Sequence, residues 1–197
     1  MRRLSALFVL LSALLSSACS DDGVRIAYSN VLPRYNRAEL FNAADGRDMP
    51  TAVVGNPFGT QQEVFEATAT RIMNGVPIGP RTRFTTTPNE TARGNYRVVM
   101  LFNPASNISS ELMCTNPDPA PLPGVGTGAA AANTDRLSLQ SAFCQGGVLF
   151  SSAYGWADRV QGPDDPRFAR LIQRIMLATF PPNRNDEACL VPFRRTC

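Results

Sequence analysis

The stretch "NYRVVMLFNP", residues 95–104, is apolar on both sides of the strand that it would form. Alternation divides its apolar side chains into two sets, one for each side: Tyr96, Val98, Met100 and Phe102, and Val99 and Leu101. A strand that is apolar on both sides is typical of the centre of a sheet with two covered faces. We therefore predict a central strand here, from which the rest of the fold extends.

Other stretches have the composition of strands and are bounded by Gly, Pro, Asn or Asp. The expected strands are "VRIAYSNV" (24–31), "TAVVGNPF" (51–58, stopping at Gly55), an edge strand in "RTRFTTTP" (81–88), "LSLQSAFC" (137–144) and "GVLFSSAYGWAD" (147–158). Because only "QGG" separates the last two, they are predicted to form a hairpin.

The first of two expected amphipathic helices follows the second strand. Thr60 and Glu63 have the spacing of a capping box, and the helix is expected from about Gln61 to Asn74, ahead of Gly75. The side chains expected on its inner side are Val64, Phe65, Thr68, Ile72 and Met73.

The second helix has equally clear ends. Asp165 is its predicted cap, Pro166 its first residue, and Pro181-Pro182 its stop. The apolar side chains at helical spacing are Phe168, Leu171, Ile172, Ile175 and Met176.

This order of elements predicts an α+β fold. We expect a two-layer sandwich, in which a mainly antiparallel sheet carries both helices on one face, within a single domain over residues 24–182. Residues 115–134 are rich in Pro, Gly and Ala and predict a mobile loop. Within this loop, "GVGTGA" (124–129) has the spacing of a dinucleotide fingerprint, but the prolines before it exclude the strand that the fingerprint needs.

The composition excludes several catalytic designs. The chain has no His, and each of its 19 basic residues is Arg rather than Lys. Without His there is no Ser-His-Asp or Cys-His couple, and without Lys there is no Schiff base or P-loop lysine. The formal net charge is +3, and it falls to +1 when Arg2 and Arg3 are left out. The rest of the chain is therefore nearly neutral, and no basic surface for nucleic acid is expected. We expect no enzymatic activity, no cofactor and no metal site.

Residues 1–18 have the three parts of a bacterial export signal: a positive start, an apolar run and the small residues Ser16 to Ala18. The apolar run is shorter than the roughly 20 residues that a membrane-spanning helix needs. Ordinary cleavage would release a protein that begins at Cys19. Alternatively, "LSSAC" resembles the bacterial lipobox, in which the Cys receives a lipid, and residues 19–23 would then be the tether.

The cysteine count favours lipidation of Cys19. The chain has five Cys, and if Cys19 carries lipid, an even set remains for an oxidising compartment. Among the possible pairings we predict Cys114–Cys144 and Cys189–Cys197, the second of which would hold the tail (183–197). Ser20 after the Cys resembles the pattern of lipoproteins sorted to the outer membrane, facing the periplasm.

Few other residues suggest a site. Tyr154 and Trp156 are candidates for a ligand-binding platform, with ordinary packing as the alternative. The adjacent pairs Asp21-Asp22 and Asp164-Asp165 are interpreted as tether and helix cap, because neighbouring carboxylates at a helix start do not converge on one substrate atom.

The motifs "GNPF" (55–58), "YRVVMLFNP" (96–104) and "FPP" (180–182) resemble those of an uncharacterised family of short alphaproteobacterial envelope lipoproteins. The layout is also similar to small α+β lipoprotein domains that assist envelope assembly or activate peptidoglycan synthases. These resemblances imply a location and nothing catalytic. We therefore expect a non-enzymatic accessory or interaction domain, bound to the membrane through an N-terminal lipid and to an unidentified envelope protein. The alternatives are a periplasmic module that binds a small apolar or aromatic ligand, and a thiol-dependent enzyme.

Overall fold

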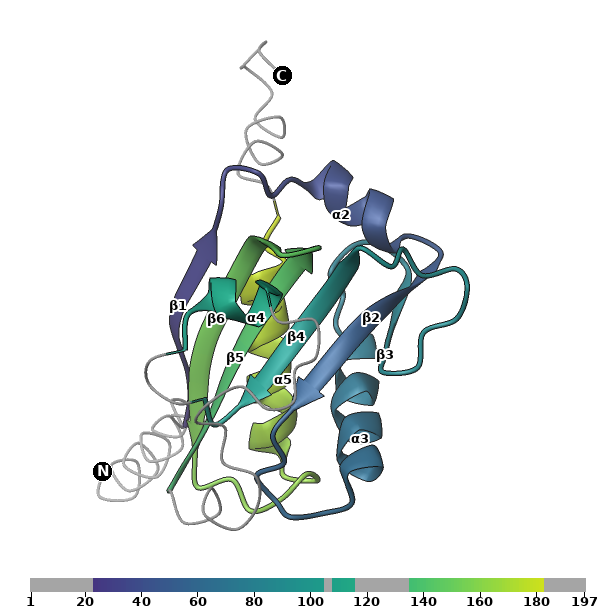
Figure 1. The fold of residues 1–197 in the computed structure, drawn as a ribbon. Helices are drawn as coiled ribbons and strands as arrows, with labels where there is room; N and C mark the ends of the chain where they lie inside the picture. Colours follow the sequence, from purple (N-terminus) through teal and green to yellow (C-terminus); the bar gives the residue numbers. More distant parts are fainter. Residues whose placement is uncertain (1–22, 105–107, 116–134, 183–197) are drawn as a thin grey trace, which may run out of the picture.

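A computed structural model describes residues 23–104, 108–115 and 135–182, which form a six-stranded sheet and its helices (Figure 1). In chain order the elements are β1 (Val24–Val31), α2 (Arg37–Ala44), β2 (Arg47–Val54), α3 (Gln62–Asn74), β3 (Thr82–Thr85), β4 (Tyr96–Phe102), α4 (Ser110–Thr115), β5 (Arg136–Gln145), β6 (Val148–Asp158) and α5 (Pro166–Thr179). The strands lie in the order β1-β6-β5-β4-β2-β3. None of the helices in the described ranges is long and apolar enough to cross a membrane.

The α+β class and the mainly antiparallel sheet are confirmed. The pairs β1–β6, β6–β5 and β5–β4 are antiparallel, whereas β2 is parallel to both β3 and β4. β4 lies inside the sheet, between β5 and β2, as predicted. Its alternating side chains enter two separate cores, with Met100 in one and Leu101 in the other. The hairpin of β5 and β6 turns at Gly146, whose φ of 57° favours glycine.

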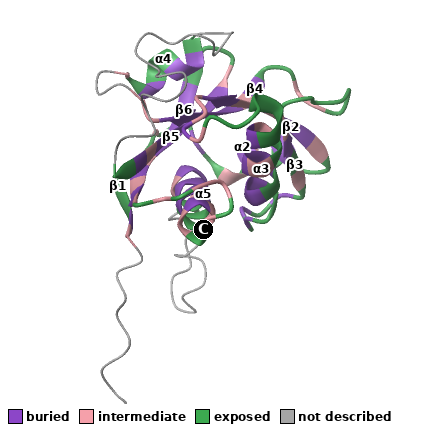
Figure 2. Ribbon diagram, turned by 90° about the horizontal axis from the view of Figure 1, so that it is seen from below, coloured by how far each residue is buried: buried purple, intermediate pink, exposed green. Residues whose placement is uncertain are grey.

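Helices α3 and α5 cover one face of the sheet, which contains the larger core (Figure 2). The rings of Phe65, Phe102 and Phe168 pack against one another with centroid distances of 4.9 to 5.8 Å. All three are almost fully buried. Burial of one such side chain stabilises the fold by about 1.5–3 kcal/mol, so this face supplies most of the hydrophobic stabilisation.

The opposite face carries the short helix α4 and a smaller core. Met113 and Cys114 of α4 cover apolar side chains of the sheet: Val54, Val99, Leu101, Ala142 and Leu149. The sequence did not predict α4 or α2. Helix α4 has only six residues, so it shows almost no periodic pattern in the sequence, and a helix of this length is not stable by itself. α2 is capped by Asn36, whose Oδ1 accepts a hydrogen bond from Glu39 N at 2.7 Å.

The predicted start of α3 is wrong in detail. The helix is present over the expected range, but its N-cap is Gln61 and no side chain completes a capping box. Thr60 belongs to the preceding turn, where Asn56 Nδ2 donates to its carbonyl oxygen at 2.6 Å. Val64, expected on the inner side, is 52% exposed, and Ala69 is buried instead.

The predicted ends of α5 are confirmed. Asp165 is the N-cap, and its Oδ1 accepts a hydrogen bond from Arg167 N at 2.9 Å, with Pro166 as the first helical residue. The C-terminal carbonyls receive hydrogen bonds from elsewhere in the fold. Ser29 Oγ donates to Ala178 O and Ser151 Oγ to Thr179 O, both at 2.6 Å. The sheet thereby satisfies carbonyl groups that a helix end leaves unpaired.

Several predictions concern residues outside the described ranges. The export signal, most of the tether and the C-terminal tail lie there, with Cys19, Cys189 and Cys197. The predicted mobile loop also lies outside, apart from Thr115, which ends α4.

Candidate functional site

The strand that follows the tether is an edge of the sheet. β1 pairs with β6 along one side, and no other strand of the described residues pairs with its opposite side. Every residue from Arg25 to Val31 is exposed. Ile26, Tyr28 and Val31 are large apolar side chains with exposed fractions of 36, 42 and 42%. A long edge strand with apolar side chains is a surface to which another strand can add.

The opposite edge of the sheet is shorter, and Asn74 of α3 occupies backbone groups of β3: its Oδ1 accepts from Phe84 N at 2.7 Å and its Nδ2 donates to Phe84 O at 3.1 Å. β3 has four residues, and Arg83 Nε donates to Asp48 Oδ1 on β2 at 2.9 Å. Asn89, in the loop after β3, donates its N–H to Asp48 Oδ2 at 3.0 Å. The hydrogen bonds from Arg83 are the main reason why the pKa of Asp48 lies below its usual value. The two edges therefore differ in how far their own side chains and loops protect them.

Three rings, Tyr28, Tyr154 and Trp156, form an aromatic strip across β1 and β6. Tyr28 stacks on Tyr154 at 5.8 Å between centroids, and Tyr154 lies 6.2 Å from Trp156. Gln140 Nε2 donates to Tyr28 OH at 3.1 Å and to Ser110 Oγ of α4 at 3.0 Å, which places the strip on the α4 face. The structure thus brings the two candidates, Tyr154 and Trp156, together with Tyr28.

Sequence reasoning did not identify Tyr28 or Arg136 as parts of this surface. The guanidinium carbon of Arg136 lies over the Trp156 ring at 4.7 Å, a cation–π distance. Tyr28 faces Tyr154 only because β1 pairs with β6 in this register. The alternation within "VRIAYSNV" predicts Tyr28 on the same side as Val24. An irregularity in the pairing between Ile26 and Tyr28 instead puts Tyr28 on the α4 face, whereas Val24 lies in the larger core.

Two adjoining cavities lie at the end of the sheet where β1 begins. The larger has a volume of about 760 Å³ and is lined by Gly23, Asp158, Arg159 and the segment from Gln161 to Arg167, with Arg170. The smaller has a volume of about 270 Å³ and shares Gln161, Gly162 and Pro163 with the first.

The capping role predicted for Asp165 agrees with the low pKa of its carboxyl group. Hydrogen bonds from Arg167 lower the pKa of Asp165 to about 2, and the Arg167 Nη2 to Asp165 Oδ2 distance is 2.8 Å. This carboxylate is therefore already engaged as helix cap and ion pair. Among the described residues, no group of three His, Cys, Asp or Glu side chains is placed to hold a metal ion.

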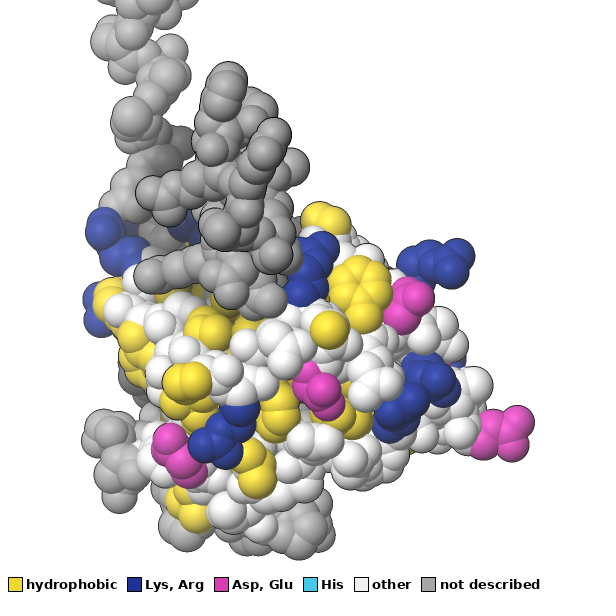
Figure 3. Space-filling model, turned by 90° about the horizontal axis from the view of Figure 1, so that it is seen from above, with side chains coloured by type: hydrophobic (Ala, Val, Ile, Leu, Met, Phe, Trp, Pro, Cys, Tyr) yellow, Lys and Arg dark blue, Asp and Glu magenta, His cyan; other side chains and the backbone are white. Residues whose placement is uncertain are grey.

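The surface at the other end of the molecule, where α2 lies, is chemically mixed. In the view of Figure 3, hydrophobic, basic and acidic side chains lie among one another over this end, without one large area of a single charge in the part that is described. The more distinctive surfaces are therefore the β1 edge and the cavity end of the sheet.

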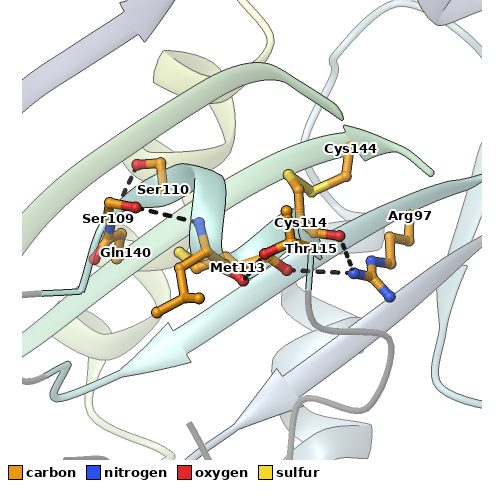
Figure 4. The surroundings of a disulfide bond; sticks show 9 residues. Arg97, Ser109, Ser110, Met113, Cys114, Thr115, Gln140 and Cys144 are labelled. Atoms are coloured by element: carbon orange, nitrogen blue, oxygen red, sulfur yellow. Dashed lines mark hydrogen bonds between the residues drawn. A yellow bond between two sulfur atoms is a disulfide. The ribbon is translucent and has the colours of Figure 1, made fainter. Parts of the chain in front are cut away.

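The predicted disulfide between Cys114 and Cys144 is confirmed. It joins α4 to β5, with both cysteines buried (Figure 4). Arg97 of β4 reinforces the same junction, because its Nη2 donates to Cys114 O at 2.5 Å. Neither cysteine of this pair is a free thiol. The other predicted pair lies outside the described residues.

The comparisons with known proteins identify only distant structures. No protein-family model matches the chain, and no curated protein matches it significantly. Two solved structures of PelC dodecamers from Paraburkholderia phytofirmans, one of them a point variant, are each 12% identical to this chain with TM-scores of 0.42. These matches cover 80 and 82% of this chain and 97 and 99% of PelC. Similarity at this level does not indicate a shared function.

Proposed function

We propose that this protein is a non-enzymatic lipoprotein of the cell envelope, anchored through Cys19, that binds an envelope protein at its β1 edge. The observation that carries the proposal is the exposure of Ile26, Tyr28 and Val31 on a strand that has no neighbouring strand on its outer side among the described residues. An extended segment of the partner would add to β1 as a further strand, with backbone hydrogen bonds and contacts to these side chains.

The position of β1 in the chain supports the same proposal. Four residues separate Cys19 from Val24, where β1 begins. A chain of this length reaches at most about 18 Å. A lipid on Cys19 would therefore hold the start of β1 close to the membrane surface. A partner in the same membrane would meet the edge strand at a restricted distance, which raises its effective concentration.

The anchoring part of the proposal is tested by replacing Cys19 with Ala. We expect the wild-type protein in the detergent-soluble membrane fraction, and the variant in the soluble periplasmic or unprocessed pool. A variant that remains membrane-bound with unchanged processing contradicts the proposed anchor. Mass spectrometry of the mature N-terminus reports the lipid directly.

The binding part is tested separately by photocrosslinking in cells from position 28 on β1. We expect a discrete adduct that is lost when Ile26 and Val31 are both changed to Lys, because charges on an edge strand oppose strand addition. Val64→Lys is the control, since Val64 is an exposed apolar residue on α3, away from β1. Adducts that survive the β1 substitutions, or that disappear with Val64→Lys, contradict the proposed surface.

A further inference from the structure

The first half of the β1 edge is already engaged by the chain itself. Gly23 O accepts a hydrogen bond from Asp158 N at 3.0 Å, so the main chain of Gly23 faces β6. Neighbouring residues of a strand alternate in direction, and the main chain of Val24 therefore faces outward. Arg174 of α5 donates from Nη1 to Val24 O at 2.7 Å. This contact covers a part of the edge that a further strand would otherwise use.

A bulge separates this half from the rest of the strand. The pairing of β1 with β6 shifts between Ile26 and Tyr28. Gly155, opposite Ile26, leaves room for the main chain of β1 at this point, because a Cβ atom there would clash with Arg25 O. Bulges disrupt the ladder of hydrogen bonds locally and protect edge strands from further pairing. An added strand is therefore expected beyond the bulge, away from the start of β1.

The second half of β1, residues 28–31, presents main-chain groups on its outer side. Leu32 N donates to Phe150 O at 3.1 Å, so Leu32 faces β6, and by alternation Ser29 and Val31 face outward. Among the described residues, no neighbouring strand pairs with these outward groups, and no side chain bonds to them as one does at the start of the strand. Outward N–H and C=O groups on every second residue are those to which an extended chain can bond.

Two exposed apolar side chains, which we call the apolar border, flank these groups on the α5 face. Leu177 follows Arg174 by one turn of α5, on the side of the helix that meets β1, and is 48% exposed. Ser29 Oγ donates to Ala178 O at 2.6 Å, which places Ser29 on the α5 face and the last turn of α5 beside the second half of β1. Alternation then puts Val31, which is also exposed, on the same face. Leu177 and Val31 form the apolar border.

We propose that the partner's strand pairs with residues 28–31 alone and carries apolar side chains at alternate positions, which pack on the apolar border. It rests on the proposed binding at β1 and narrows that binding to one segment of the edge and one kind of occupant. The other face of this segment carries Tyr28, bonded to Gln140, and so receives the remaining, more polar side chains of the partner. A helix would leave the outward groups of Ser29 and Val31 unpaired, because its own N–H and C=O groups bond within the helix.

Substitutions on α5 test the apolar border in cells, with a photoreactive side chain at position 28. Leu177→Lys should reduce the adduct at least about fivefold, because a charge would then face the apolar side chains of the added strand. Leu177→Met keeps an apolar side chain of similar volume and should preserve it. Val64→Lys is the control, since Val64 is 52% exposed on α3. Each variant must first accumulate to the wild-type level. An adduct that survives Leu177→Lys, or that Val64→Lys reduces equally, overturns the contact with α5.

The position of the partner is tested by moving the photoreactive side chain along one face of β1. Arg25, Tyr28 and Asn30 are replaced in turn, since all three lie on the α4 face. We expect adducts from positions 28 and 30 and at least about tenfold less from position 25, because Arg174 and the bulge oppose strand addition there. Mass spectrometry should map the adduct to a segment of another protein with apolar residues at every second position.

The outcomes separate this proposal from the binding on which it rests. Equal adducts from positions 25 and 30 overturn the restriction to residues 28–31 but leave binding at β1 intact. An adduct that maps to a segment without alternating apolar residues, to a second copy of this chain or to residues 183–197 overturns the proposed occupant. No adduct from position 28 overturns both the occupant and the binding at β1.

Discussion

The two faces of the sheet are covered in different ways. On one face, α3 and α5 pack large aromatic and aliphatic side chains against the strands. On the other face, the six-residue helix α4 covers a small core of mainly aliphatic side chains and is joined to β5 by a disulfide. Apolar contacts hold long helices in place, whereas a single helical turn needs a covalent bond or strong polar contacts to stay on the sheet.

The two faces also differ in how completely their buried polar groups are hydrogen-bonded. The α5 face is closed, and the groups that it buries have their hydrogen bonds within the fold, such as Ser151 to the end of α5. The α4 face contains the aromatic strip and two buried polar atoms without hydrogen-bond partners among the described residues, Ser152 Oγ and Trp156 Nε1. Unsatisfied atoms of this kind call for a specific explanation. The aromatic strip therefore lies on the less heavily packed side of the sheet.

The largest effect is expected on the α5 face. Phe168→Ala should reduce the free energy of unfolding by about 3–5 kcal/mol, because it leaves a cavity among Phe65 and Phe102. Leu177→Ala, on an exposed position of the same helix, should change it by less than about 0.5 kcal/mol. Urea unfolding of both variants measures the difference. Equal losses would mean that α5 is not held mainly by its buried side chains.

On the α4 face, the disulfide should account for most of the stabilisation. The double change Cys114→Ala and Cys144→Ala opens a loop with a sequence separation of 30. Loop entropy predicts a loss of about 3–4 kcal/mol. Hydrogen exchange should show faster exchange in α4 than in α5. A uniform increase across both helices would contradict the view that the disulfide acts mainly on one face.

Two adjacent serines give a direct comparison of the faces. Ser151→Ala should cost about 1–2 kcal/mol, because the buried Thr179 carbonyl loses its donor at 2.6 Å. Ser152→Ala should be neutral or stabilising, because the buried Ser152 hydroxyl has no partner. Thermal unfolding of the two single variants provides the measurement. A larger loss for Ser152→Ala would indicate that its hydroxyl has a partner in solution.

Acid should weaken the α5 face through Asp165. The pKa of Asp165 is about 2 in the fold against 3.8 normally. Its contribution is therefore present above about pH 4 and is lost as the pH falls towards 2. Asp165→Asn keeps a capping side chain but no longer titrates. The variant should lose less stability than the wild type between pH 4 and pH 2, by about 1 kcal/mol or less, in denaturant unfolding. Parallel losses would assign the acid sensitivity to other carboxylates, such as Asp48.

The smallest effect is expected when residues 117–133 are replaced by a few Gly and Ser residues. Few large apolar side chains occur in this stretch, and closure entropy changes slowly with loop length. The melting temperature should change little. A marked decrease would show that this segment contributes to the stability of the α4 face, and would make the two faces more alike than we propose.

The elements whose ends are marked by strong local sequence signals were predicted correctly. The ends of α5 follow from Asp165, Pro166 and the prolines after the helix, and the hairpin follows from "QGG". The weaker signals failed. Thr60 and Glu63 have the spacing of a capping box, but Asn56 binds Thr60 in a turn that ends before the helix begins.

The sequence by itself determined the helices α3 and α5, the strands and the inner position of β4, since periodicity, caps and turn residues act over a few positions. Only the tertiary structure decided that β1 is an edge beside β6, that β2 and β4 are parallel, and that Arg136 lies over Trp156. These arrangements join segments far apart in the chain. Their free energy depends on which surfaces meet after the loops close, and no local pattern of residues encodes that.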